Sequence, residues 1–176
     1  MDIAMMLSAV AAATGLVLFP LAMVYAGLMD LVTLKIRNTL VVGIGLTWAI
    51  LAPLAGFTLV ELGWSVAVAC LVFAVTFLCF ALGWIGGGDA KLAAVTALWF
   101  QPEQALLYFI YASVLGGALT LVLLQMRMRM LPAALDRVPW IARLHDPQTG
   151  VPYGAAMAPA ALIVFPQTAW VAHAAF

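Results

Sequence analysis

Residues 62–82 read LGWSVAVACLVFAVTFLCFAL, a stretch without a charged side chain. At 1.5 Å per residue, a helix of this length spans the ~30 Å hydrocarbon core of a bilayer. A strand of a membrane β-barrel would alternate apolar and polar residues over about ten positions, and this stretch does not alternate. It therefore predicts a transmembrane helix.

The same apolar character extends along the whole chain, because 67% of its 176 residues are hydrophobic and only 8% are charged. Soluble domains carry about 45–50% apolar and ~25% charged residues, so a water-soluble fold is excluded. We predict an all-α membrane protein, a single polytopic domain over residues 1–176 with about six transmembrane helices. The predicted segments are Ile3–Met29, Leu40–Ala55, Leu62–Leu82, Ala90–Phe100, Ala105–Met126 and Tyr153–Ala172.

The charged residues sort onto two sides of this bundle. All the basic residues follow the first, third or fifth segment: Lys35, Arg37, Lys91, Arg127, Arg129, Arg137 and Arg143. Asp2, Glu61 and Glu103 fall on the opposite side. The positive-inside rule places the basic side in the cytoplasm, so both the N and C termini are predicted to be non-cytoplasmic.

Residues 127–151 mix basic and apolar side chains, which is typical of a short interfacial helix, broken near Pro139. Because the net charge is zero, we expect no nucleic acid as a partner, and the excess of apolar surface makes the lipid bilayer the expected surroundings.

Two aspartates fall at membrane depth, where ionisable groups are costly and mark functional sites. Asp30 ends the first predicted span, and Asp89 follows Gly86, Gly87 and Gly88. The topology brings both to the cytoplasmic end of the bundle. Two carboxyl groups that meet there can share a proton and activate water, as aspartic proteases do. The alternative is that Asp89 caps a helix after a flexible loop and Asp30 ends another at the interface.

Three segments of the chain resemble the prepilin peptidases, the type IV leader peptidase family of intramembrane aspartic proteases. Residues 86–89, GGGD, match that family's G-x-G-D motif, and Asp89-Ala90-Lys91-Leu92 is similar to its continuation. Residues 30–38, DLVTLKIRN, resemble its first-aspartate segment, with Arg37 where the family usually has proline. Residues 151–156, VPYGAA, resemble the Pro-Tyr-Gly sequence that opens the family's last helix.

The resemblance implies that Asp30 and Asp89 are the catalytic pair and that no cofactor or metal is needed. It implies cleavage after a glycine that ends the basic leader of a type IV or Flp-type prepilin or pseudopilin, at the cytoplasmic face of the bacterial inner membrane. The substrate partner is then a single precursor helix in that membrane. The short chain is similar to the compact members that serve Flp/Tad pili. Which pilin is cut, and the oligomeric state of the enzyme, stay open.

Larger family members carry a cytoplasmic four-cysteine zinc segment and also methylate the new pilin N-terminus. This chain has two cysteines, Cys70 and Cys79, which cannot form a four-thiolate zinc site. We therefore expect proteolysis without methylation.

Several other residues are candidates for shaping the site. Gly86, Gly87 and Gly88 lack side chains and leave room for a substrate backbone beside Asp89. Lys35 and Lys91 either orient a substrate carboxylate or reach lipid phosphates. Asn38 either bonds within the loop or caps the second helix, and Tyr153 either contacts the site or belongs to the aromatic belt.

Two other classes of function remain open from the sequence. A small ion- or proton-coupled transporter would use the two aspartates as a relay, although the inverted repeats common in transporters are not visible here. A non-catalytic subunit for pilus assembly would tolerate replacement of both aspartates.

Overall fold

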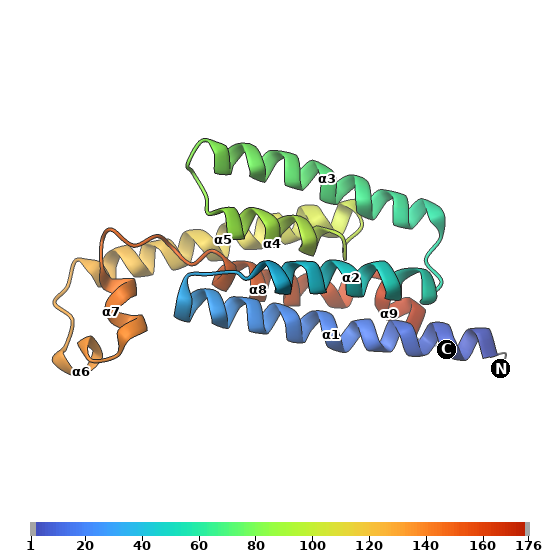
Figure 1. The fold of residues 1–176 in the computed structure, drawn as a ribbon, viewed down its shortest axis with the longest axis horizontal. Helices are drawn as coiled ribbons and strands as arrows, with labels where there is room; N and C mark the ends of the chain where they lie inside the picture. The colour runs from blue at the N-terminus through green and yellow to red at the C-terminus, as the bar shows by residue number, and fades with distance from the viewer. Residues whose placement is uncertain (1–2, 175–176) are drawn as a thin grey trace.

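The computed structural model describes residues 3–174, and these residues form helices joined by short loops, without β-strands (Figure 1). The elements are α1 (Ile3–Thr33), α2 (Asn38–Leu54), α3 (Leu59–Ala81), α4 (Gly87–Ala97), α5 (Pro102–Arg127), α6 (Ala133–Asp136), α7 (Pro139–His145), α8 (Gly154–Val164), the 3-10 helix η1 (Phe165–Gln167) and α9 (Ala169–Ala174). The all-α prediction is confirmed. Asp2, which the sequence assigned to the non-cytoplasmic side, lies outside the described residues.

Three helices are long and apolar enough to cross a membrane: α1, α3 and α5. The helix α2 and the stretch Gly154–Gln167 are apolar but shorter. At 1.5 Å per residue, the eleven residues of α4 extend only about 16 Å, which does not cross a ~30 Å core. The structure therefore supports a multi-pass membrane protein in which several elements enter the bundle without spanning it alone.

The first predicted helix was too short. α1 continues past Met29 to Thr33, so Asp30 lies inside the last turn and not at the helix end. The helix stops at Leu34, whose φ of 54° is in the left-handed region, and the Leu34 amide donates to the Asp30 carbonyl at 2.7 Å. This turn leads directly into the loop before α2. The backbone geometry thus places the Asp30 side chain on an intact helical turn.

The start of the third helix also differs from its predicted position. A capping box at Thr58 starts α3 at Leu59, three residues before the predicted Leu62. The Glu61 amide donates to the Thr58 hydroxyl, and the Glu61 carboxylate accepts from the Thr58 amide at 2.8 Å. This reciprocal pair satisfies two amides at the helix end. Glu61 therefore belongs to the first turn of α3 and not to a connecting loop.

The prediction of one continuous last helix over Tyr153–Ala172 is wrong. The chain breaks into α8, η1 and α9, and Pro166 stands at the start of η1. Proline has no amide hydrogen for an α-helical bond, and its ring clashes with the preceding turn. The interfacial segment is also divided. It forms α6 and α7, and α7 begins at Pro139, where the sequence predicted a break.

The ends of the helices define two ends of the bundle. The beginning of α1 and the end of α9 lie at one end, and α6 and α7 project at the other (Figure 1). The C-terminal end of α1 and the N-terminal ends of α4 and α8 all face the α6–α7 end (Figure 1). The basic loops therefore gather at the same end as Asp30 and Asp89.

The interior is filled by small residues and one aromatic cluster. Many residues of α1 that face the bundle are Ala or Gly, whereas the large side chains of α3 are mostly exposed to the surrounding apolar phase. The rings of Phe19 and Trp99 stack at 4.7 Å between centroids, and those of Trp99 and Trp170 also at 4.7 Å. Phe57 packs on Trp170 at 4.8 Å. These rings hold α1, the end of α4 and α9 together.

We predict that Gly15→Ala destabilises the protein. A Cβ atom at Gly15 would lie 2.6 Å from the ring of Trp170, which is buried and held between Trp99 and Phe57. Overpacking of this kind costs about 1–3 kcal/mol, so the melting temperature in detergent should fall. The matched control is Gly43→Ala, because a Cβ atom there meets nothing within 4 Å. An equal or higher melting temperature for Gly15→Ala would contradict the packing described here.

Candidate active site

Asp30 is carried by the last turn of α1 and points into the bundle. The residue is only 4% exposed. Its Oδ2 atom accepts a hydrogen bond from the amide of Gly154 at 2.7 Å, across 124 positions of sequence. A carboxylate away from water requires such donors. The contact joins the end of α1 to the beginning of α8.

Asp89 lies in the first turn of α4. Gly86, and not Asp89, occupies the N-cap position of that helix. The Asp89 carboxyl group turns back toward Gly86, so that a Cβ atom on Gly86 would lie 2.9 Å from Asp89 Oδ2. A carboxylate in the first turn interacts favourably with the helix dipole. The beginning of α4 therefore stabilises Asp89 and leaves its side chain half-buried in the wall of the pocket.

The two carboxyl groups face one pocket of about 440 Å³ at the α6–α7 end of the bundle. Asp30 reaches the pocket from α1 and Asp89 from α4. The residues that line the pocket are Asp30, Leu34, Lys35, Ile36, Arg37, Gly86, Gly87, Gly88 and Asp89. Six of the nine predicted site residues thus line this pocket, and the other three, Asn38, Lys91 and Tyr153, do not. The pocket holds two carboxyl groups, two cations and a glycine-rich wall.

The three glycines form one wall of this pocket by packing closely on their neighbours. A Cβ atom on Gly88 would lie 3.2 Å from the Ile36 Cβ atom, so the α4 turn rests against the loop after α1. A Cβ atom on Gly87 would lie 3.0 Å from the ring of Phe80, which is largely exposed. The absence of side chains therefore decides how near α4 comes to the Asp30 segment.

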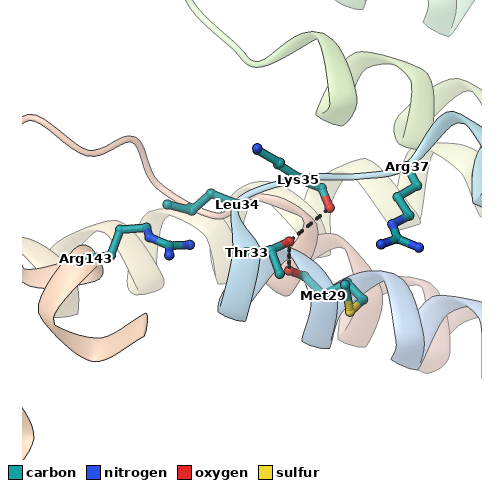
Figure 2. Close-up of a pocket in the computed structure, with 6 residues that line it drawn as sticks. All are labelled: Met29, Thr33, Leu34, Lys35, Arg37 and Arg143. Atoms are coloured by element: carbon teal, nitrogen blue, oxygen red, sulfur yellow. Dashed lines mark hydrogen bonds between the residues drawn. The ribbon is translucent and has the colours of Figure 1, made fainter. Parts of the chain in front are cut away.

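A second pocket of about 660 Å³ adjoins the first and shares Leu34, Lys35 and Arg37 with it. Figure 2 shows Arg143 reaching toward the end of α1 from α7, with Lys35 and Arg37 on the loop that follows. The Arg143 guanidinium donates to the Val32 carbonyl at 3.3 Å. The lining of this pocket, among the described residues, contains three cations and no carboxylate. The region beside the two aspartates is therefore suited to an anionic group.

Lys91 and Asn38 lie near the site but outside the carboxyl pocket. The Lys91 ammonium donates to Asn38 Oδ1 at 3.1 Å, which ties α4 to the beginning of α2. The predicted capping role of Asn38 is wrong, because Arg37 occupies the N-cap position of α2. Both side chains thus support the arrangement of helices around the glycine wall.

Tyr153 likewise does not line the carboxyl pocket. It precedes α8, and its ring packs on Gly116 of α5, where an added Cβ atom would lie 3.2 Å away. No role was predicted for its neighbour Gly154, although the resemblance of residues 151–156 pointed to this segment. Arg127 was also missed. Its guanidinium donates to the carbonyls of Leu144 and Thr149, each at 2.8 Å.

No group of three or more His, Cys, Asp or Glu side chains that could hold a metal ion occurs within residues 3–174. The pocket itself offers carboxyl groups, cations and a backbone amide. Two adjacent carboxyl groups can divide the roles of proton acceptor and proton donor between them.

The fold and the site define a multi-pass helical membrane protein with two aspartates facing one pocket. Residues 17–121 match the model of the type IV leader peptidase family, and the chain belongs to that family. The matched range contains Asp30 and Asp89 but not Gly154. No curated protein and no solved structure matches the chain. Family membership implies aspartic peptidase activity and suggests cleavage of leader peptides.

We predict that Gly86→Ala lowers peptidase activity more than Gly87→Ala does. The new Cβ atom at position 86 would meet Asp89 Oδ2 at 2.9 Å and displace the carboxyl group. At position 87 it would meet only the exposed Phe80 ring, which can rotate away. A displacement near 1 Å at a reacting group can reduce the rate about 100-fold. Initial rates measured at equal protein levels test this, and equal losses for both variants would contradict it.

Proposed function

We propose that the protein is an intramembrane aspartic endopeptidase that removes the basic leader from type IV or Flp-type prepilins and pseudopilins, cutting after a glycine. Asp30 and Asp89 are its catalytic residues. Their meeting in one pocket, from positions far apart in the sequence, is the observation that carries this proposal. The family match is consistent with it.

The reaction needs one ionised and one protonated carboxyl group. The ionised group takes a proton from water while the water oxygen attacks the carbonyl carbon of the leader glycine. The protonated group donates a hydrogen bond to the carbonyl oxygen as negative charge develops there. The C–N bond then breaks, and the nitrogen takes up a proton. The products are a leader with a new carboxyl end and a mature pilin with a new amine.

A substrate reaches this pocket along its glycine wall. Gly86 is exposed, and Gly87 and Gly88 are half-buried, so an extended peptide can lie against them without meeting side chains. Lys35 lines the same pocket and is placed to meet a substrate carboxylate or a lipid phosphate. We assign Lys91, Asn38 and Tyr153 to shaping the site, because each packs or bonds on an element that borders it.

We further propose that the chain crosses the bacterial inner membrane about six times as one domain, with the α6–α7 end in the cytoplasm and both termini outside. The gathering of basic loops at that end favours this orientation. It places the two aspartates at the cytoplasmic boundary, where the leader of a precursor helix would lie. We also propose that the protein serves a Flp/Tad pilus system, and that it cleaves its substrate without methylating the product.

We predict that Asp30→Asn and Asp89→Asn each abolish cleavage of a co-expressed Flp-type prepilin. An amide neither ionises nor accepts the proton from water, so the rate should fall by at least about 1000-fold. The test is the gel shift and product mass of the prepilin, at matched membrane levels of each variant. Glu103→Gln is a control, because Glu103 is exposed at the opposite end of the bundle.

Near wild-type cleavage by either aspartate variant would remove that aspartate from the mechanism. Failure of the wild-type protein to cut several such precursors would reject the peptidase assignment.

The orientation is predicted to be visible by cysteine labelling. In a Cys70→Ser, Cys79→Ser background, Glu103→Cys should react with an impermeant maleimide in intact cells, and Gln148→Cys should react only after lysis. Both positions are exposed. The reverse pattern would show that the bundle is inserted the other way.

A further inference from the structure

The amide of Gly154 is the polar group that α8 contributes directly to Asp30. Gly154 is the first residue of α8 and is buried. Its N–H donates to Asp30 Oδ2 at 2.7 Å, and that distance is typical of a strong hydrogen bond to a charged acceptor. The first amides of a helix have no partner within the helix. At this position the Asp30 carboxyl group supplies the missing acceptor.

Only glycine fits at position 154. A Cβ atom there would lie 2.8 Å from Asp30 Oδ2, 2.9 Å from its Cβ and 3.0 Å from its Cγ. The backbone of Gly154 is not among those with positive φ, so space and not conformation demands glycine. One turn earlier on α1, a Cβ atom on Gly27 would lie 2.7 Å from the Cβ of Ala158. Two glycines therefore allow α1 and α8 to approach closely enough for the hydrogen bond.

The segment before Gly154 is held in place by α5. Arg127, the last residue of α5, donates through Nε to the Leu144 carbonyl and through Nη2 to the Thr149 carbonyl, each at 2.8 Å. A further contact from Nη2 reaches the Gly150 carbonyl at 3.3 Å. Arg127 thus fixes the chain from the end of α7 to within four residues of Gly154. The segment that leads to the Gly154 amide is therefore held by hydrogen bonds to α5 and is not an unconstrained loop.

We propose that Gly154 is a positioning residue whose amide keeps Asp30 as the ionised carboxylate that takes the proton from water, so that Asp89 is the protonated partner. A donor aimed at one carboxylate oxygen stabilises the negative charge on it and leaves the other oxygen to accept from water. The inference rests on the proposed peptidase function and adds to it the division of roles between the two aspartates.

The charged and titratable groups around Asp30 are few. Asp89 from α4 and Lys35 and Arg37 from the loop after α1 line the same pocket. Arg143 reaches the Val32 carbonyl from α7, and Tyr153 is the residue before α8. The cations belong to exposed side chains, whereas the Gly154 amide is buried against the carboxyl group. The amide is therefore the partner with a fixed position.

The first test is the steady-state kinetics of Gly154→Ala against the matched control Gly117→Ala. A Cβ atom at Gly117 meets nothing within 4 Å, so this control should cut at the wild-type rate. For Gly154→Ala we expect kcat to fall about 10- to 100-fold with KM changed less than about twofold. The acidic limb of the kcat/KM profile should move to higher pH by about one unit, because a donor to the carboxylate is lost. Unchanged kcat and pH profile would overturn the proposal.

A second pair of variants tests the same contact without altering Gly154. Gly27→Ala should separate α1 from α8 and reproduce the loss of kcat and the shift of the acidic limb. Gly27→Ala with Ala158→Gly removes the atom that clashes, so this double variant should restore both. Arg127→Gln should act in the same direction as Gly27→Ala, and Arg129→Gln, on an exposed neighbour, should not. A double variant that stays impaired would contradict the proposal.

The third test needs no substrate. Tyr153-Gly154 is the only Tyr-Gly pair in the chain, so combined ¹³C-carbonyl tyrosine and ¹⁵N-glycine labelling isolates the Gly154 amide in an NMR spectrum. Its proton shift should titrate with pH in the wild-type protein, at the midpoint of the acidic limb of kcat/KM. Asp30→Asn should remove most of this pH dependence, whereas Asp89→Asn should retain it with a moved midpoint. A resonance that does not titrate, or that titrates unchanged in Asp30→Asn, would overturn the proposal.

Loss of the peptidase function and loss of the role of Gly154 give different experimental results. If the wild-type protein cuts no prepilin but the Gly154 resonance titrates with Asp30, the peptidase function fails and the contact stands. If cleavage requires both aspartates but Gly154→Ala cuts with wild-type kcat and pH profile, the function stands and the role of Gly154 fails.

Discussion

The Asp30 carboxyl group lies almost wholly buried in a protein whose surroundings are largely hydrocarbon, and that condition constrains the structure around it. An ionised carboxylate without a partner is very costly to bury, so it needs donors that are in place before any substrate arrives. A long polar side chain from a neighbouring helix could supply such a donor. Here the donor is a backbone amide of α8, at 2.7 Å from the Asp30 carboxyl group. A backbone donor can reach the carboxyl group only if α1 and α8 are in near contact.

Close contact in turn explains why the interior of the bundle consists of small residues. The driving force that buries large side chains in water is weak between helices surrounded by lipid. The large residues of α3 accordingly face outward, and Ala and Gly fill the faces of α1 and α8 that meet. The one bulky cluster, around Trp99 and Trp170, lies where α9 folds back on α1. It anchors the part of the bundle that the break at Pro166 would otherwise leave separate from α8.

The basic loops contribute at a different level. Arg127 donates hydrogen bonds to three backbone carbonyls and holds the segment that leads into α8, so its role is structural. Lys35, Arg37 and Arg143 line a pocket next to the carboxyl groups and shape the electrostatic field that an approaching substrate meets. Under the proposed function, these cations would repel a basic leader and favour a bound orientation in which the leader's positive charges lie away from this pocket.

Composition and charge pattern were sufficient to predict a helical membrane protein, the end of the bundle at which the basic loops lie, and Asp30 and Asp89 as the residues to examine. These features are local. The length of an apolar segment, the charge of a loop and a carboxylate beside glycines can each be recognised in a short window of sequence. The continuation of α1 past Met29, the break at Pro166 and the role of Gly154 could not be recognised in this way. Each depends on what a residue meets in space, and the partner of Gly154 is 124 positions away. Short windows of sequence thus single out Asp30 and Asp89 as candidates, whereas the amide that meets Asp30 follows from the packing of α1 against α8, because that packing sets the distance between them.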